Sequence, residues 1–425
     1  MIALAYRAAS DLAAPLLRRH LARRVLTGKE EASRLDERYG IASLPRPAGR
    51  LGWLHAASVG EMQSLLPLVE ALGAREGDLH FLVTTGTVTS ARLLARRRLP
   101  RVIHQYLPLD RHAWVARFLD HWHPDFALWV ESEFWPNLLK EAARRRIPMA
   151  LVNGRLSARS LSRWAWAPGF AAALMGGFRV VLAQDDIQGR RLAALGARQP
   201  QTLGNLKFAA SAPGADETEL AALAASTAGR PVWLAASTHP GEDSIVAAAH
   251  RSLKARYGNL LTIIAPRHAE RGEAIAGELR AAGLSLARRS KNEPITQTTD
   301  IYLADTLGEL GLFYRLARVF FVAGSYRWQG HNPIEPALLH RAVVSGPRVA
   351  NFQDIFDRMT RAGAVTIADE AGLAEALNRL LQDPEPAAGS AEAFARKEGE
   401  GILARIVAAL EPVVGSIGRG NLGDH

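Results

Sequence analysis

The segment Leu51-Gly-Trp-Leu-His-Ala-Ala-Ser-Val-Gly-Glu61 carries the clearest structural signal in this chain. Its apolar first part predicts a buried strand over Leu51–Ala57, and Ser58-Val59-Gly60 predicts a turn. Glu61 then opens a helical pattern of leucine and valine residues. A carboxylate is thereby predicted where a parallel sheet meets a helix, which is the edge at which open α/β sheets bind ligands. Taken alone, however, Glu61 is better explained by its interaction with the positive end of the helix dipole.

Apolar runs of this kind alternate with helical patterns along the whole chain. In the first half the predicted strands are Leu51–Ala57, His80–Thr85, Val102–Tyr106, Phe126–Val130, Met149–Val152 and Val180–Ala183. In the second half they are Val232–Ala236, Leu260–Ala265, Leu284–Ala287, Ile301–Ala304, Val319–Val322, Ala342–Ser345 and Val365–Ile367. This alternation predicts an α/β protein made of right-handed βαβ units with parallel sheets.

The length of 425 residues favours two domains, because a single hydrophobic core stops growing at about 250–300 residues. The small, turn-rich segment Ala209–Asp216 is the best candidate for a linker. We therefore expect a membrane-associating N-terminal helix region at 1–40, a Rossmann-like domain at 41–208 and a second one at 217–425, with the two domains facing each other across a cleft. A final helical stretch near Ala391–Leu410 is a candidate to cross back onto the first domain.

The net charge of +10 indicates either an anionic partner or charges spread over solvated faces. The basic clusters are not interleaved with aromatic residues, as they are in platforms for single-stranded nucleic acid. A phosphate-bearing lipid or a membrane surface is therefore expected rather than nucleic acid. The chain has no cysteine, which excludes disulfides and thiolate metal sites.

The N-terminal stretch Met1–Leu26 is rich in alanine and leucine, but charged residues interrupt it from Arg7 to Arg19. No run of about 20 uncharged apolar residues is present, so a membrane-spanning helix is not predicted. Two alternatives follow. The stretch forms an interfacial helix that lies on an anionic leaflet, or it packs on the first domain as an ordinary helix.

Several sequence patterns of known chemistry are absent. Neither half has a Gly-x-Gly-x-x-Gly fingerprint after its first strand, and no Walker lysine loop is present. These absences disfavour a dinucleotide cofactor and P-loop phosphoryl transfer. No compact metal-binding motif occurs either, so we expect a site that uses neither metal nor cofactor.

Polar residues follow the predicted strands of the first half. Glu131-Ser-Glu-Phe-Trp-Pro-Asn137 comes directly after Phe126–Val130, so Glu131 is expected to face the same opening as Glu61. Lys207, beside a Gly-Asn turn, can offer a cation to a phosphate or to developing negative charge. The alternatives are that Glu131 caps a helix or pairs with an arginine, and that Lys207 is an ordinary surface residue.

Three polar loops follow strands in the second half, at Ala265–His268, Asp305–Leu310 and Gly324–Ala337. Pro333 presets the first turn of a helix whose free N–H groups suit an anion. Glu335, one turn into that helix, is placed to accept hydrogen bonds from ribose hydroxyls. Three such loops in one domain predict a binding site for a nucleotide or phosphate.

Six motifs occur in the order found in a known family. They are Trp53–Glu61, Glu131–Asn137, Gly204–Phe208, Pro266–His268, Gly308–Leu310 and Gly330–Pro336. From about residue 50 to beyond Asp369 the chain resembles the 3-deoxy-D-manno-octulosonic acid (Kdo) transferases of lipopolysaccharide assembly. Three positions depart from the family pattern: Ala158 stands where glutamate is frequent, Ala209 where an acidic residue is usual and Ala269 where proline is common.

This resemblance implies a GT-B fold whose first domain holds the acceptor and whose second domain holds CMP-Kdo, a co-substrate rather than a cofactor. It implies inverting, metal-independent transfer to a phosphorylated lipid A precursor, lipid IVA, at the cytoplasmic face of the bacterial inner membrane. Glu61 would be the general base, and Glu131 and Lys207 would stabilise the transition state. The residues that would hold CMP are Pro266, Arg267, Gly308, Glu309, Leu310, Asn332, Pro333, Ile334 and Glu335.

Two rival functions are considered beside this one. Another GT-B glycosyltransferase or an epimerase that uses a UDP-sugar would have the same architecture. A non-enzymatic protein that binds a membrane surface or nucleic acid would use the charge of +10. That second rival leaves the three loops of the second half without an explanation.

Overall fold

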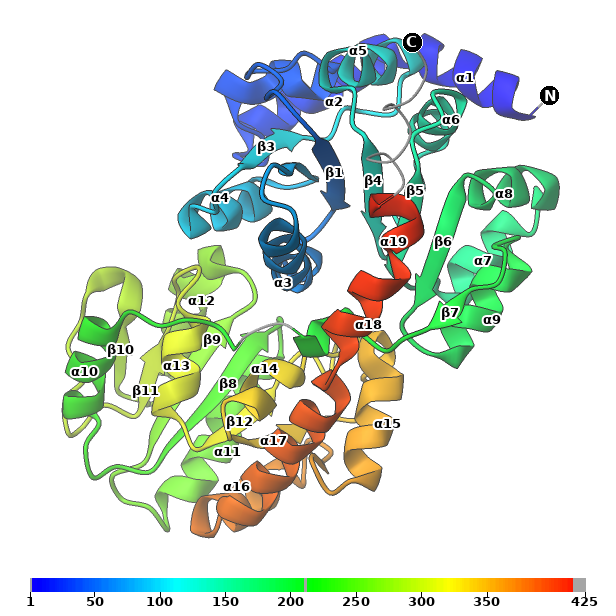
Figure 1. Cartoon of the computed structure of the whole chain (residues 1–425). Helices are drawn as coiled ribbons and strands as arrows, with labels where there is room; N and C mark the ends of the chain where they lie inside the picture. The colour runs from blue at the N-terminus through cyan, green and yellow to red at the C-terminus, as the bar shows by residue number, and fades with distance from the viewer. Residues whose placement is uncertain (1, 210–211, 416–425) are drawn as a thin grey trace, which may run out of the picture. The chain divides into compact units, whose positions relative to one another are not determined.

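The computed structural model describes residues 2–209 and 212–415, and the chain divides into two compact units (Figure 1). One unit comprises Met1–Ala210 with Gly399–His425, and the other comprises Ser211–Glu398. The division falls inside the expected linker Ala209–Asp216. The sequence placed 217–425 in the second domain, with a final helix as a candidate to cross back, and the structure returns the chain to the first unit at Gly399.

The first unit is built around a parallel sheet with seven strands in the described part of the chain, ordered β3-β2-β1-β4-β5-β6-β7. The strands are β1 (Leu51–Ala56), β2 (His80–Thr85), β3 (Val102–Tyr106), β4 (Phe126–Val130), β5 (Met149–Gly154), β6 (Phe178–Ala183) and β7 (Gln201–Thr202). The sequence predicted the first six to within two residues at either end. It did not predict β7, because two exposed polar residues give no apolar run.

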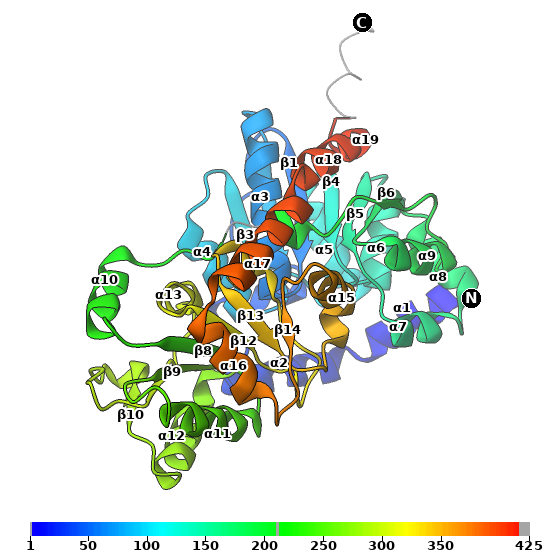
Figure 2. The same ribbon diagram turned by 90° about the horizontal axis from the view of Figure 1, so that it is seen from below.

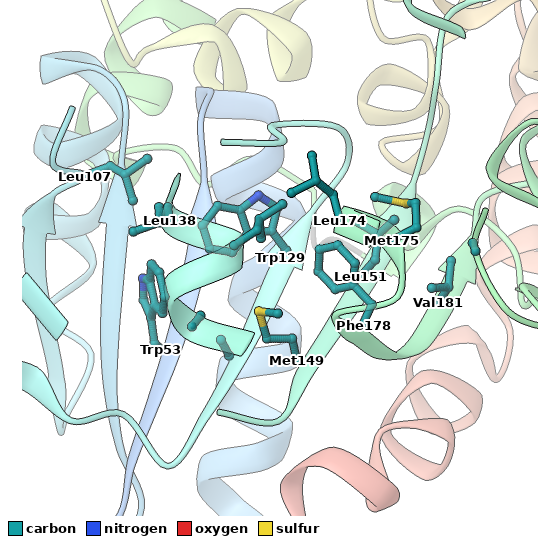
Figure 3. Close-up of a cluster of buried hydrophobic side chains, with 14 of the residues drawn as sticks. Trp53, Leu107, Trp129, Leu138, Met149, Leu151, Leu174, Met175, Phe178 and Val181 are labelled. Carbon is teal, nitrogen blue, oxygen red and sulfur yellow. The ribbon is translucent and has the colours of Figure 1, made fainter. Parts of the chain in front are cut away.

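Large apolar side chains fill the core against this sheet (Figure 3). The rings of Trp53 on β1 and Trp129 on β4 meet edge to face with their centroids 5.1 Å apart. Such aromatic pairs contribute about 0.5–1.5 kcal/mol beyond the burial of their area. Gly52 lies opposite Phe126, and a Cβ atom at residue 52 would come within 2.4 Å of that ring. The core therefore holds β1 directly beside β4.

Helices cover the first sheet and frame its carboxyl edge. They are α3 (Val59–Arg75), α4 (Val88–Arg97), α5 (His112–Trp122), α6 (Pro136–Arg144), α7 (Ala158–Trp164), α8 (Pro168–Met175), α9 (Asp186–Ala194) and the 3₁₀ turn η2 (Leu206–Ala209). The C-terminal helices α18 (Ile402–Ala409) and α19 (Glu411–Val414) also belong to this unit. Helix α18, labelled in Figures 1 and 2, contacts α3 and η2.

The N-terminal region forms α1 (Ile2–Leu12), α2 (Ala14–Leu26) and the 3₁₀ turn η1 (Ala32–Tyr39). Tyr6 of α1 donates a hydrogen bond to Asp110 at 3.0 Å, and α1 contacts α5, so this region packs on the first unit. Four leucines of the two helices are nevertheless strongly exposed, namely Leu4, Leu12, Leu16 and Leu26. Across residues 2–209 and 212–415, no helix has the length and apolarity needed to cross a bilayer.

The second unit repeats the doubly wound plan. Within the residues described, its seven parallel strands are ordered β10-β11-β9-β8-β12-β13-β14. They are β8 (Val232–Thr238), β9 (Leu261–Pro266), β10 (Leu286–Arg288), β11 (Ile301–Leu303), β12 (Val319–Val322), β13 (Ala342–Ser345) and β14 (Thr366–Ile367). All seven were predicted, with β10 displaced toward its C-terminal end. Both sheets are thus of the Rossmann type, as the alternating pattern indicated.

The helices of the second unit differ in length, and the shortest ones lie after strands. The longer ones are α10 (Glu217–Ser226), α11 (Glu242–Lys254), α12 (Gly272–Ala281), α13 (Leu310–Leu316), α15 (Gln353–Arg361), α16 (Leu373–Gln382) and α17 (Glu385–Gly399). The short elements are η3 (Ala269–Arg271), η4 (Arg289–Lys291), α14 (Ile334–Leu338) and η5 (Ala350–Phe352). The helix expected after Pro333 is therefore a short one, α14, of five residues.

Candidate active site

Glu61 lies in the first turn of α3, at the carboxyl edge of β1. Ser58 is the N-cap of α3, and its hydroxyl oxygen accepts a hydrogen bond from the Glu61 N–H at 3.3 Å. The carboxylate of Glu61 reaches back to accept from the Ala57 N–H at 2.8 Å and from the Ser58 hydroxyl at 2.9 Å. This is a variant of the capping box, in which the backbone donor to Glu61 is Ala57, the residue before the N-cap. It confirms the expected turn between strand and helix and fixes the direction of the Glu61 side chain.

Glu131 and Lys207 form an ion pair at the same edge of the sheet. Glu131 follows β4, and its Oε1 accepts from the Lys207 Nζ at 2.6 Å. Glu131 has a φ of +60°, a conformation that is uncommon for residues other than glycine. Glu131 is 9% exposed as a whole residue, as is Glu61. Because β1 and β4 are paired neighbours, the expectation that the two acidic turns share one edge is confirmed.

The surroundings of Glu61 change its affinity for protons. The pKa of Glu61 is raised from 4.5 to about 7, chiefly by burial and in addition by the negative charge of Glu131. The Ala57 N–H, the Ser58 hydroxyl and the Lys207 ammonium act in the opposite direction and lower the Glu61 pKa. A carboxylate whose pKa lies near neutral pH can both take up and release a proton under physiological conditions, which is the requirement for a general base.

A second set of polar side chains holds this ion pair in place. The Gln184 amide, after β6, donates to Glu131 at 3.4 Å and to the Asn153 carbonyl oxygen at 3.2 Å. The Asn153 side chain, on β5, accepts from the Leu206 N–H at 2.9 Å and so anchors the turn that carries Lys207. Sequence reasoning did not single out Gln184 or Asn153. The available signal was their position at the ends of predicted strands, like that of Glu131.

In the second unit, three aromatic side chains gather at the carboxyl ends of β8 and β12. The His239 ring stacks against Trp328, with centroids 5.0 Å apart, and against His331, with centroids 5.2 Å apart. The Nε2 atoms of the two histidines are 2.9 Å apart. The pKa of His331 is lowered from 6.5 to about 3, chiefly by burial and in addition by the nearby positive charge of Arg267. Arg267, singled out by the sequence, therefore lies beside histidines that the sequence analysis did not assign.

A buried carboxylate fixes the two loops that carry these rings. Glu242, which is fully buried at the start of α11, accepts from the backbone N–H groups of His239 at 3.0 Å, Gly324 at 2.6 Å and Tyr326 at 3.0 Å. Gly324 has a φ of +72°, and a Cβ atom there would lie 2.6 Å from the His331 ring. Only glycine therefore fits between the strand end and the histidine.

The remaining residues predicted to contact a nucleotide lie on two neighbouring loops. Asn332 precedes α14, where its side chain accepts from the Ile334 N–H at 3.0 Å and donates to Glu335 at 3.4 Å. Tyr314 also donates to Glu335, at 3.3 Å. Glu309, after β11, pairs with Arg289 at 2.6 Å.

The strands β11, β9, β8 and β12 are consecutive in the sheet. The loops at Gly308–Leu310, Pro266–Arg267 and Asn332–Glu335 therefore follow strands that end at one edge. In the part of the chain that the structure describes, no group of three histidine or acidic side chains is arranged to hold a metal ion.

Comparison with known proteins decides the family. The family model described as 3-deoxy-D-manno-octulosonic-acid transferase (kdotransferase) matches residues 33–210. The 3-deoxy-D-manno-octulosonic acid transferase of Haemophilus influenzae is 35% identical over 390 residues, covering 89% of this chain and 91% of that protein. This chain belongs to the Kdo transferases. The resemblance drawn from the six sequence motifs is thereby confirmed.

Relatives of this Kdo transferase also occur outside bacteria. The probable mitochondrial 3-deoxy-D-manno-octulosonic acid transferase of Arabidopsis thaliana is 35% identical and covers 89% of this chain and 88% of that protein. Among solved structures, the UDP-GlcNAc 2-epimerase of Neisseria meningitidis covers 86% of this chain and 100% of its own, with a TM-score of 0.60 and 12% identity. That likeness concerns the fold alone, which is of the GT-B type.

Proposed function

We propose that this Kdo transferase moves Kdo from CMP-Kdo to a hydroxyl group of a phosphorylated lipid A precursor, lipid IVA. The transfer is inverting and needs no metal ion. The observation that carries the proposal is the buried Glu61 carboxylate, oriented by a capping box beside the Glu131–Lys207 ion pair. The three residues come from separate parts of the sequence, and a purely structural helix cap does not require the other two.

Glu61 acts as the general base that removes the proton from the attacking hydroxyl. A positioned base typically accelerates such a step by ~10²–10⁴-fold, and it works best when its pKa lies near the working pH. The pKa of Glu61, about 7, satisfies that condition. The hydrogen bonds from Ala57 and Ser58 leave the carboxylate one defined direction for the incoming hydroxyl.

Glu131 and Lys207 act on the charge that develops during transfer. The Lys207 ammonium is held by Glu131 at 2.6 Å, so its position is fixed before the reaction starts. A fixed cation in a site that excludes water stabilises developing negative charge more strongly than a mobile one. Glu131 in turn raises the proton affinity of Glu61, so the two members of the pair have opposite effects on the base.

The nucleotide binds at the carboxyl edge of the second sheet. CMP leaves as an anion, and the exposed Arg267 supplies a positive charge for its phosphate. Glu335, oriented by Tyr314 and Asn332, accepts hydrogen bonds from the ribose hydroxyls. Pro266, the loop Gly308–Leu310 and the residues Pro333 and Ile334 complete the contacts with CMP.

The N-terminal helices contact the anionic cytoplasmic leaflet of the inner membrane, from which the lipid acceptor is taken. Exposed leucines at 12, 16 and 26 occur on the same two helices as exposed arginines at 18, 19 and 23. This combination of apolar and basic residues is typical of helices that lie in the membrane interface. The overall charge of +10 adds long-range attraction to an anionic surface.

A direct assay tests this function. The purified full chain is incubated with CMP-Kdo and lipid IVA, with and without a metal chelator. The masses of the lipid products are then measured by mass spectrometry. The proposal expects product masses increased by Kdo units and no loss of activity with chelator. Binding of UDP but not of CMP in calorimetry would instead favour the rival enzyme that uses a UDP-sugar.

A further inference from the structure

The first unit contains a cavity of about 250 Å³ to which the proposed mechanism assigns no role. Elements around the carboxyl edge of the first sheet form it: helix α2, the 3₁₀ turn η1 and the segments that follow β1 to β4. Its apolar wall includes Leu21, Leu107, Leu109 and the ring of Trp135, and His55 also lines it. We call this cavity the His55 pocket.

His55 contributes a hydrogen-bond acceptor that has no use within the fold. Its Nδ1 lies 3.1 Å from the carbonyl oxygen of Thr84 and 3.0 Å from the Thr84 hydroxyl oxygen. A carbonyl oxygen can only accept, so Nδ1 carries the hydrogen and Nε2 is left with a lone pair. Nε2 is buried and has no hydrogen-bond partner among the described residues. Buried polar atoms without a partner are rare, and each calls for an explanation.

The His55 pocket adjoins the proposed catalytic base. Ala57 lines the pocket, and its N–H is the group that holds the Glu61 carboxylate at 2.8 Å. His20 and Arg24 bring α2 to another part of the wall. Pockets that enclose a whole small ligand usually measure ~300–1,000 Å³. A volume of about 250 Å³ therefore suits one part of a larger molecule.

We propose that the His55 pocket is an acceptor subsite, which takes an apolar acyl-type chain bearing a hydroxyl or amide N–H that donates to His55 Nε2. The apolar wall receives the chain, and the lone pair of Nε2 selects a chain that carries a donor near its attachment point. The contact through Ala57 places the rest of the same molecule beside Glu61. This subsite rests on the proposed function, because it assumes a lipid acceptor.

Steady-state kinetics with two acceptors test the subsite. Leu109, partly exposed on the pocket wall, is changed to Trp to fill the space, and Leu44→Trp, at an exposed leucine outside the pocket, is the matched control. The acceptors are lipid IVA and the same phosphorylated disaccharide with its acyl chains removed. We expect Leu109→Trp to raise the KM for lipid IVA at least tenfold and to leave the KM for CMP-Kdo and for the deacylated acceptor within twofold.

Equal effects of Leu109→Trp on both acceptors, or no effect on either, would overturn the subsite. Failure of the proposed function looks different, because the unaltered protein would then turn over neither acceptor. The Leu44→Trp protein should behave as the unaltered chain does with lipid IVA. A change there as large as that of Leu109→Trp would also overturn the subsite, since the effect would not depend on the pocket.

A spectroscopic measurement tests the His55 contact without turnover. In the full chain labelled with ¹⁵N-histidine, the Nε2 resonance of His55 is assigned by its absence in His55→Phe. Octanamide, which has an N–H donor, should shift this resonance upfield, whereas methyl octanoate, which has none, should not. If His55→Phe fails to fold, the loss of the octanamide response in Leu109→Trp identifies the signal. An Nε2 resonance that stays unmoved by octanamide up to its solubility limit would contradict the proposal.

Discussion

The carboxyl edges of the two sheets present different chemistry on the same type of scaffold. At the first edge, Glu61, Glu131 and Lys207 are mostly buried and hydrogen-bonded to one another or to the backbone. At the second edge, Arg267 is exposed and Trp328 is 59% exposed, beside the partly buried His331. Burial at the first edge shifts the pKa of a carboxylate to about 7, which suits proton transfer. Exposure at the second edge leaves cationic and aromatic surface available to a ligand. In the proposed function, the first edge therefore carries the proton transfer and the second edge binds the nucleotide.

The largest expected effect concerns the base. Glu61→Gln keeps the shape of the side chain but removes its basicity, so kcat should fall by about 10²–10⁴-fold while the Kd for CMP stays nearly unchanged. Glu70→Gln, on an exposed position of the same helix, is the control and should retain full activity. Calorimetry with CMP and a transfer assay measure the two quantities. Full activity of a purified Glu61→Gln protein would show that the first edge does not supply the general base.

The second edge is tested by changing its cation. Arg267→Ala should raise the KM for CMP-Kdo by about 10–100-fold, because a charge-assisted hydrogen bond contributes about 1.5–3 kcal/mol. The pH at which activity is half-maximal should not move, since Arg267 belongs to the other unit. Arg256→Ala, an exposed arginine elsewhere in the second unit, is the matched control. An unaltered KM for CMP-Kdo together with a shifted pH profile would show that Arg267 acts on the base and not on nucleotide binding, which would contradict the roles given to the two edges.

The ion pair of the first edge should move the pH profile in two opposite directions. Lys207→Met removes a positive charge that lowers the Glu61 pKa, so the midpoint of the rise in kcat/KM should shift to higher pH. Glu131→Gln removes a negative charge that raises this pKa, so the midpoint should shift to lower pH. Shifts in the same direction for both variants would show that the electrostatic account of Glu61 is wrong, whatever the loss in rate.

The smallest expected effect is on stability. The folded pKa of Glu61 is about 7 and its ordinary value is 4.5, so the folded state binds more protons than the unfolded state between these pH values. The stability from this group is complete below pH 4.5 and is lost as the pH rises through 7. The difference between these two pKa values corresponds to roughly 3 kcal/mol. Urea unfolding between pH 4.5 and 8 should therefore show a smaller decline for Glu61→Gln than for the unaltered chain.

The sequence was sufficient to predict the strands of both sheets and the two acidic residues at the first edge. Apolar runs predicted thirteen strands, and Glu61 and Glu131 could be expected together because neighbouring parallel strands end at the same edge. It was insufficient to predict the contact between His239 and His331. These residues are 92 positions apart, and their contact depends on the two loops that Glu242 holds in place. The return of the chain to the first unit at Gly399 was foreseen only as a candidate crossing, since helical periodicity does not show which unit a helix contacts. The pKa of Glu61 was also beyond the sequence, because it arises from burial.

The pH dependence of kcat/KM for the unaltered protein is the most direct test of the claim that Glu61 is a base tuned by burial. This quantity reports the pKa values of essential groups in the free enzyme. Measured from pH 5 to pH 9 with lipid IVA and CMP-Kdo, kcat/KM should rise with pH and reach half of its plateau near pH 7, and the residual activity of Glu61→Gln should lack this rise. A half-maximal value near pH 4.5, or a rise near pH 7 that persists in Glu61→Gln, would contradict it.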